Sequence, residues 1–159
     1  MQTFKQLLVH FTKSNGIYEQ FMYYLAKYKI NISGNINPLR LISYYMPYEE
    51  GKTYWLKISR EWTQYVNRTL FIPLFVNFLK ENKAYEQYVY NLKDRTNVLL
   101  NMSEDKKIET YLQIIEPKDF VSFPFFNSFS SLNSRMWSKI AFDWIVIYCK
   151  TLKYGNKIY

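Results

Sequence analysis

Residues 4–28 read FKQLLVHFTKSNGIYEQFMYYLAKY, and residues 71–95 read FIPLFVNFLKENKAYEQYVYNLKDR. The two stretches are related at an offset of 67 residues (71 minus 4), and a match of this kind is the signature of an internal repeat. The identical pairs are Phe4/Phe71, Leu7/Leu74, Val9/Val76, Phe11/Phe78, Lys13/Lys80, Asn15/Asn82, Tyr18/Tyr85, Glu19/Glu86, Gln20/Gln87, Tyr23/Tyr90 and Leu25/Leu92. Phe21 and Tyr88 form a further, conservative pair.

Two later blocks repeat in the same order. Residues 55–62, WLKISREW, match residues 137–144, WSKIAFDW, and the shared frame is Trp-x-Lys-Ile-x-x-acid-Trp. Between these blocks, the segment that begins at Pro38 matches the one that begins at Pro117. We therefore predict two tandem modules, at residues 1–68 and 69–159.

The spacing of apolar residues predicts an all-α fold. Phe4, Leu7, Leu8 and Phe11 lie at i, i+3, i+4 and i+7, which is the apolar stripe of an amphipathic helix. The second module has extra residues before its proline, and Ser103 followed by two acids is a typical helix start. We expect two similar helical modules packed as one compact body, with one extra helix at about 103–115 in the second.

The composition excludes several kinds of chemistry. One Cys and one His cannot form a disulfide or a structural zinc site. Four scattered Gly cannot build a phosphate-binding loop. We therefore expect no metal, no cofactor and no catalytic activity.

The charge is basic and spread along the chain. The formal net charge is +8, of which residues 1–68 contribute +5 (9 basic minus 4 acidic) and residues 69–159 contribute +3 (12 minus 9). Such a surface favours anionic partners. If the partner is a nucleic acid, the basic residues expected to bind it are Arg40, Lys52, Lys57, Arg60 and Arg68.

Two repeated motifs each allow a structural and a functional interpretation. The spacing Trp55/Trp62 and Trp137/Trp144 puts both indoles of a module on one helix face. They are either packed in the core, which we favour, or form an aromatic clamp. In the repeated Tyr-Glu-Gln, Glu19 and Glu86 either form a carboxylate pair for acid–base work, or the Tyr packs in the core while Glu and Gln face solvent or satisfy a helix end. We favour the second interpretation.

Aromatic residues outside the helical stripes are candidates for partner binding. Residues 120–129, FVSFPFFNSF, contain five Phe and no charge, so they form either an exposed apolar patch or a core segment. The equivalent stretch of the first module, LISYYMPYEE, is more polar. The candidate binding residues are Phe123, Phe125, Phe126, Phe129, Tyr44, Tyr45 and Tyr48.

The apolar stretches are short. No segment reaches the 18 or so apolar residues that a membrane-spanning helix needs, and the N-terminal residues do not form a signal peptide. We therefore expect a cytoplasmic location and no membrane partner, and the oligomeric state stays open.

Each module resembles the small open reading frames of bacteriophages and related mobile elements. These carry a YE[EK]F-type helix, a Pro-x-x-Tyr-Ile-Ser segment, a Pro-Glu-Gly turn and Phe-Trp-x-Lys-Ile-x-x-x-Trp. The first module matches them at residues 18–21, 38–43, 49–51 and 54–62, and the second at 85–88, 117–122 and 136–144. The second module lacks the Pro-Glu-Gly turn. The resemblance implies a phage or mobile-element origin, in a family without an assigned activity.

These observations predict a non-catalytic, phage-type helical protein. We expect it to bind a host or viral protein, such as a defence or transcription factor, in the host cytoplasm. The alternatives are direct nucleic-acid binding, because of the charge and the aromatic residues, and a structural role in the virion.

Overall fold

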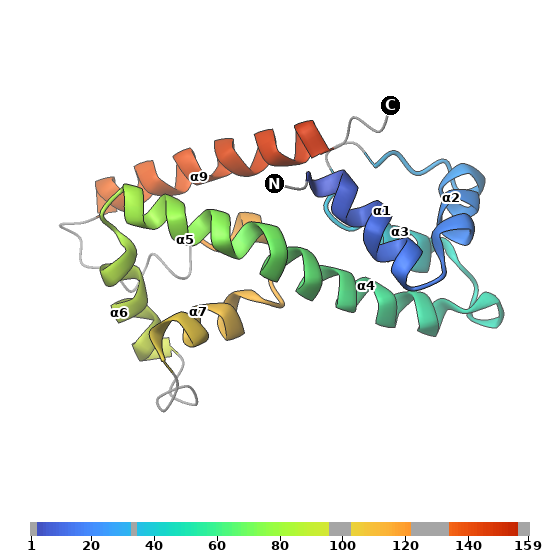
Figure 1. Cartoon of the computed structure of the whole chain (residues 1–159), viewed down its shortest axis with the longest axis horizontal. Coiled ribbons are helices and arrows are strands. Elements are labelled where there is room, and N and C mark those ends of the chain that lie inside the picture. Colours follow the sequence, from blue (N-terminus) through green and yellow to red (C-terminus); the bar gives the residue numbers. More distant parts are fainter. Residues whose placement is uncertain (1–2, 33–34, 96–102, 122–133, 156–159) are drawn as a thin grey trace. The chain divides into compact units, whose positions relative to one another are not determined.

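The computed structural model describes residues 3–32, 35–95, 103–121 and 134–155, and all elements in these residues are helical (Figure 1). The all-α prediction is confirmed. The α-helices are α1 (Phe4–Ser14), α2 (Tyr18–Lys27), α3 (Pro38–Tyr45), α4 (Lys52–Val66), α5 (Ile72–Glu81), α6 (Tyr85–Arg95), α7 (Glu104–Leu112) and α9 (Ser134–Gly155). Short turns complete the list: the 3-10 turns η1 (Tyr48–Glu50) and η4 (Pro117–Asp119) and the π-helical turn η2 (Asn67–Phe71).

Local sequence signals explain where the helices start. Thr3 and Gln6 form a capping box at α1, in which each side chain bonds the backbone N–H of the other residue. At α3, Asn37 caps the helix and Pro38 occupies its first turn, where a missing N–H costs nothing. Ser103 caps α7, which lies within the extra helix that we predicted at about 103–115.

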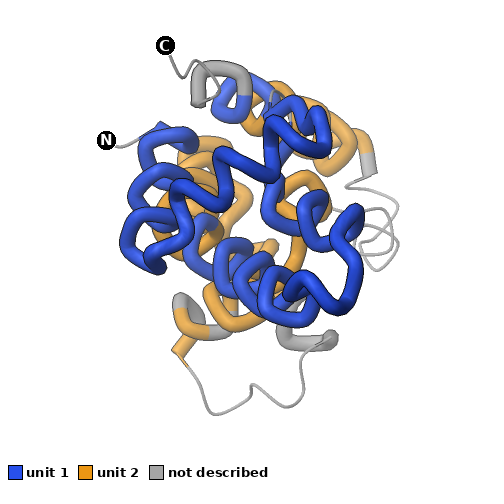
Figure 2. The backbone as a smooth tube through the Cα atoms, turned by 90° about the vertical axis from the view of Figure 1, so that its right-hand side faces the viewer, with its two compact units in different colours: residues 1–66, 149–159 blue, residues 67–148 orange. Residues whose placement is uncertain are grey.

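The chain divides into two compact units, which Figure 2 colours separately. Unit 1 comprises residues 1–66 and 149–159, and unit 2 comprises residues 67–148. These units are defined by contacts, whereas the predicted boundaries at 1–68 and 69–159 follow sequence similarity. The predicted boundaries and the packing of two tandem modules into one body stay predictions.

In unit 1, helices α1 and α3 both pack against α4. The core between them contains the apolar stripe of α1 and both indoles of α4. Its largest fully buried side chains are Trp62, Phe4, Leu7, Leu8 and Leu39. The Trp62 ring lies 5.6 Å from Phe4 and 5.3 Å from Phe11, between ring centroids.

In unit 2, the core is built around Phe75 on α5. Its ring centroid lies 4.8 Å from Trp144, 5.1 Å from Tyr88 and 5.2 Å from Phe120. Asn67, at the start of η2, is fully buried, and its Nδ2 donates to the carbonyl oxygens of Leu112, Gln113 and Ile115 at 2.8–3.0 Å. This amide ties the end of α7 to η2.

Equivalent segments of the two modules have equivalent local structure. Helices α1 and α5 end at Ser14 and Glu81, and α2 and α6 begin at Tyr18 and Tyr85, so both boundaries agree at the offset of 67. The ring contact of Phe11 with Trp62 has its counterpart in Phe78 and Trp144, at 5.8 Å. The repeated sequence therefore produces repeated helix boundaries and a repeated aromatic contact.

Candidate functional site

The three predicted tyrosines of the first module lie together on the surface of unit 1. Tyr44 and Tyr45 end α3, and Tyr48 begins η1. Their side chains are 74%, 55% and 75% exposed. These three tyrosines belong to a larger group that we call the tyrosine patch: Tyr23, Tyr24, Tyr28, Tyr44, Tyr45, Tyr48 and Tyr54.

Ring contacts join most of the tyrosine patch into one network. From α2 to α3, the centroid distances are 5.2 Å for Tyr23–Tyr24, 5.7 Å for Tyr24–Tyr28, 5.8 Å for Tyr28–Tyr45 and 5.5 Å for Tyr44–Tyr45. Tyr24 also meets the buried Trp55 of α4 edge-on at 5.6 Å. Because Trp55 belongs to the core, the exposed rings are attached to a rigid base.

Two lysines extend over the rings of the tyrosine patch. The ammonium of Lys27 lies 5.9 Å from the Tyr23 ring centroid and 5.7 Å from that of Tyr28. It is also 4.0 Å from a carboxylate oxygen of Glu50. Lys52 lies over Tyr48 at 5.2 Å. Such cation–π contacts stabilise exposed sites by about 0.5–1 kcal/mol each, so they hold the rings in place.

Tyr28 has a constrained hydroxyl at the centre of this network. Its hydroxyl oxygen is buried and has no hydrogen-bond partner among the described residues. Burial raises the pKa of Tyr28, while the neighbouring Lys27 ammonium acts in the opposite direction. The Tyr28 hydroxyl therefore stays protonated at neutral pH.

Sequence reasoning missed Tyr23, Tyr24, Tyr28 and Tyr54. Periodicity assigned α2 and α4 by their apolar stripes, and it did not examine aromatic residues on the opposite, polar face. Tyr23 is 60% exposed and Tyr54 is 46% exposed. Large aromatic residues on the solvent-facing side of an amphipathic helix are the sequence signal that could have indicated these tyrosines.

The second module does not repeat the aromatic content of the patch. At the offset of 67, Tyr23 corresponds to Tyr90, but Tyr24 and Tyr28 correspond to Asn91 and Arg95. The four predicted phenylalanines of this module lie outside the described residues, so their role as binding residues stays a prediction. They are Phe123, Phe125, Phe126 and Phe129.

The candidate nucleic-acid residues come from three elements: Arg40 from α3, Lys52, Lys57 and Arg60 from α4, and Arg68 from η2. Arg68 belongs to unit 2, and the other four belong to unit 1. On α4, a rotation of about 100° per residue separates Lys52 from Lys57 by about 140° and brings Glu61 within about 40° of Lys57. Lys52 is half-buried and lies over Tyr48. Arg60 falls between Lys52 and Lys57, so the three basic side chains of α4 lie within an arc of about 140°, and Glu61 lies at the edge of that arc beside Lys57.

The tryptophans are core residues, so the alternative of an aromatic clamp is wrong. Trp62, Trp137 and Trp144 are fully buried, and Trp55 is 4% exposed. The indole N–H of Trp62 donates to the Ile36 carbonyl oxygen at 2.8 Å, and that of Trp144 donates to the Pro117 carbonyl oxygen at 2.7 Å. Because all four indoles are buried, no ring face is open to a ligand.

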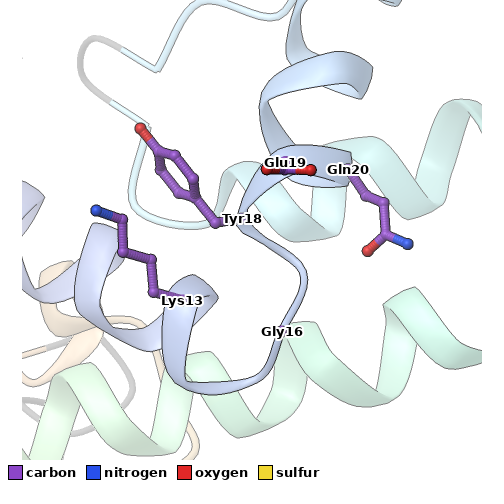
Figure 3. Close-up of a pocket in the computed structure, with 5 residues that line it drawn as sticks. All are labelled: Lys13, Gly16, Tyr18, Glu19 and Gln20. Carbon is purple, nitrogen blue, oxygen red and sulfur yellow. The ribbon is translucent and has the colours of Figure 1, made fainter.

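In the repeated Tyr-Glu-Gln the glutamates face solvent, as the favoured interpretation predicted, whereas Tyr18 and Tyr85 are half-buried and do not belong to the core. Glu19 and Glu86 are exposed, each in the first turn of its helix. In unit 1 the motif lines a hollow of about 440 Å³ together with Lys13 and Gly16 (Figure 3). Among the described residues, no three His, Cys, Asp or Glu side chains come together as a metal site.

Of the helices that the structure describes, none combines the length and the apolar character needed to cross a membrane. Neither a family model, nor a curated protein, nor a solved structure matches this chain.

Proposed function

We propose that this chain is a non-catalytic binding protein that docks a protein partner through the tyrosine patch. One observation carries the proposal: ring contacts join the exposed Tyr23, Tyr44 and Tyr45 through the half-buried Tyr24 and Tyr28, and Tyr24 packs edge-on against the buried Trp55. Tyrosine is enriched at interfaces because it offers a large amphipathic area at low cost in conformational entropy. A network that is already assembled lowers that cost further.

The arrangement of the patch favours a protein over a nucleic acid. Single-stranded nucleic acids stack their bases on open ring faces. Here, Lys27 and Lys52 cover ring faces of Tyr23, Tyr28 and Tyr48. The exposed Glu49 and Glu50 follow Tyr48 directly and would repel phosphates.

The resemblance to phage reading frames suggests the class of partner. We propose a host or viral factor, met in the host cytoplasm. Nucleic-acid binding through Arg40, Lys52, Lys57, Arg60 and Arg68, of which all but the half-buried Lys52 are exposed, remains the alternative, and a structural role in the virion is the third.

The test compares a patch variant with a matched control. We expect the double variant Tyr44→Ala/Tyr48→Ala to weaken partner binding by about 2 kcal/mol or more, which is about thirtyfold, because buried interface tyrosines are frequent hot spots. The control is Tyr90→Ala, which removes a tyrosine that is 66% exposed and lies outside the patch. The partner is captured from nuclease-treated host lysate, purified and titrated by calorimetry.

Oligonucleotide titrations test the alternative of nucleic-acid binding. Fluorescence anisotropy with single- and double-stranded DNA at about 0.15 M salt should give only weak, salt-sensitive binding of about 10⁻⁴–10⁻⁶ M. Nanomolar affinity with a steep salt slope, unchanged by the patch variant, would contradict the proposal.

A further inference from the structure

A surface hollow occurs at the same place in both units. In unit 1 it measures about 440 Å³ and is lined by Lys13, Gly16, Tyr18, Glu19 and Gln20. In unit 2 it measures about 420 Å³ and is lined by Lys80, Lys83, Tyr85 and Glu86. Every lining residue of the second hollow is the equivalent, at the offset of 67, of a lining residue of the first.

The turn that shapes each hollow has the same hydrogen bonds. The Asn15 side chain donates to the Phe11 carbonyl oxygen, and that of Asn82 donates to Phe78, both at 2.9 Å. The following residue has a positive φ in both cases, 68° at Gly16 and 55° at Lys83. The two hollows therefore have the same backbone frame.

Each hollow also has the same cation over the same ring. The Lys13 ammonium lies 4.9 Å from the Tyr18 ring centroid, and the Lys80 ammonium lies 4.9 Å from that of Tyr85. In Figure 3 the Lys13 and Tyr18 side chains run alongside each other, while Gln20 extends in another direction. Glu19 and Glu86 add an exposed carboxylate to the lining of each hollow.

Two exposed charges, one lysine and one glutamate, are common to both hollows, while several exposed positions of α1 and α5 differ between the modules. The solvent-facing positions of α1 and α5 have diverged: Gln6 stands against Pro73, His10 against Asn77, and Ser14 against Glu81. The exposed pairs Lys13/Lys80 and Glu19/Glu86 are identical. Lys13 and Lys80 lie in the last turn of their helices, and Glu19 and Glu86 lie in the first turn of theirs, where the helix dipole favours charges of these signs. Both hollows therefore have the same arrangement of one ammonium and one carboxylate.

We propose that the two hollows are equivalent peptide-binding sites, each taking a short segment that carries an acidic and a basic side chain. The acidic side chain pairs with the ammonium of Lys13 or Lys80, and the basic one pairs with the carboxylate of Glu19 or Glu86. Hydrogen bonds between ionised groups are stronger than neutral ones, and opposite charges at two points fix the direction of the segment. One chain can thus hold two copies of the same segment.

The two sites differ in one charge. Lys83 replaces Gly16, so the hollow of unit 2 has a second ammonium. The additional cation favours the acidic end of the peptide. The site of unit 2 should therefore bind more tightly at low salt, and its affinity should fall more steeply as salt is added.

The test uses blocked peptides of the form Asp-(Gly)n-Arg, with zero to three glycines, and the neutral Asn-(Gly)n-Gln series as a control. Binding to the full chain is followed by ¹H–¹⁵N NMR at the Gly16 and Lys83 amides. At least one charged peptide should shift the amide resonances of both residues, and the neutral peptides should shift neither resonance. Lys13→Gln should lower the peptide affinity measured from the Gly16 amide resonance about tenfold and leave the affinity measured from the Lys83 resonance unchanged. Lys80→Gln should do the reverse.

Two outcomes would overturn the proposal: no charged peptide shifts either amide, or the neutral series binds equally well. Glu19→Gln gives a second check, since it should weaken binding of the basic end without removing the cation–π contact. Tyr44→Ala/Tyr48→Ala should leave peptide binding intact. A failure of the hollows and a failure of the tyrosine patch can therefore be told apart.

Discussion

The most informative prediction for stability concerns Trp144 on α9. Its side chain is fully buried, and its ring centroid lies 4.8 Å from Phe75, 5.8 Å from Phe78 and 6.0 Å from Phe120. Its indole N–H donates to the Pro117 carbonyl oxygen in a buried hydrogen bond of 2.7 Å. Two variants separate these contributions: Trp144→Phe removes the donor and part of the ring system, and Trp144→Ala removes the whole side chain.

The expected magnitudes follow from the surroundings of the indole. In Trp144→Phe the buried Pro117 oxygen loses its donor, which costs about 1–3 kcal/mol, and the smaller ring loses further contacts. We therefore expect a loss of about 2–3 kcal/mol in the free energy of unfolding. Trp144→Ala also leaves a cavity among three phenylalanine rings, and its loss should be about 4–5 kcal/mol.

Urea unfolding followed by circular dichroism measures both losses. The control is Phe142→Ala on the same helix, whose side chain is 69% exposed and should cost less than about 0.5 kcal/mol. A loss below about 1 kcal/mol for Trp144→Ala, or one equal to that of the control, would refute the packing argument. If partner binding were lost as well, the indole would be a ligand contact after all.

Three further predictions concern single groups. Tyr88→Phe should cost about 1–2 kcal/mol at neutral pH, because the Tyr88 hydroxyl donates to the Phe120 carbonyl oxygen at 2.7 Å in the core. Burial raises the pKa of Tyr88 well above its ordinary value of 10.0, so the contribution of its hydroxyl to the free energy of unfolding is complete below pH 10.0 and declines above it. In urea titrations above pH 10.0, the free energies of unfolding of the parent and of Tyr88→Phe should therefore approach each other. Asn67→Asp should lower the free energy of unfolding, measured with urea or heat, by about 3 kcal/mol or more, because a carboxylate would face three carbonyl oxygens. A variant as stable as the parent would show that the hydrogen bonds of the Asn67 amide to the end of α7 do not contribute to stability. Gly16→Ala should lower the free energy of unfolding by about 1–2 kcal/mol, because φ is 68°, a value that strains an alanine backbone. An added Cβ meets no atom within 4 Å, so no steric clash contributes, and an unchanged unfolding midpoint would exclude the strain.

The sequence alone determined the helices and the burial of the tryptophans. Apolar spacing located α1, α2 and α4, and the repeat located their counterparts α5, α6 and α9. These signals are local: a stripe at i, i+3, i+4 and i+7 has to face the core wherever the helix lies. The seven-residue spacing of Trp55 and Trp62 placed both indoles on such a face, and both are buried.

The tertiary structure decided which surface residues meet. Tyr28 and Tyr45 lie 17 residues apart (45 minus 28), and their rings touch only because α2 and α3 pack together. Tyr88 differs from its counterpart Phe21 by a hydroxyl, and this hydroxyl donates a hydrogen bond to the carbonyl oxygen of Phe120, which is 32 residues away in the sequence. Helix formation depends on neighbours within one or two turns, whereas a surface patch or a buried hydrogen bond depends on the path of the whole chain. The repeat could therefore be found in the sequence, but the tyrosine patch and the shared geometry of the two hollows required coordinates.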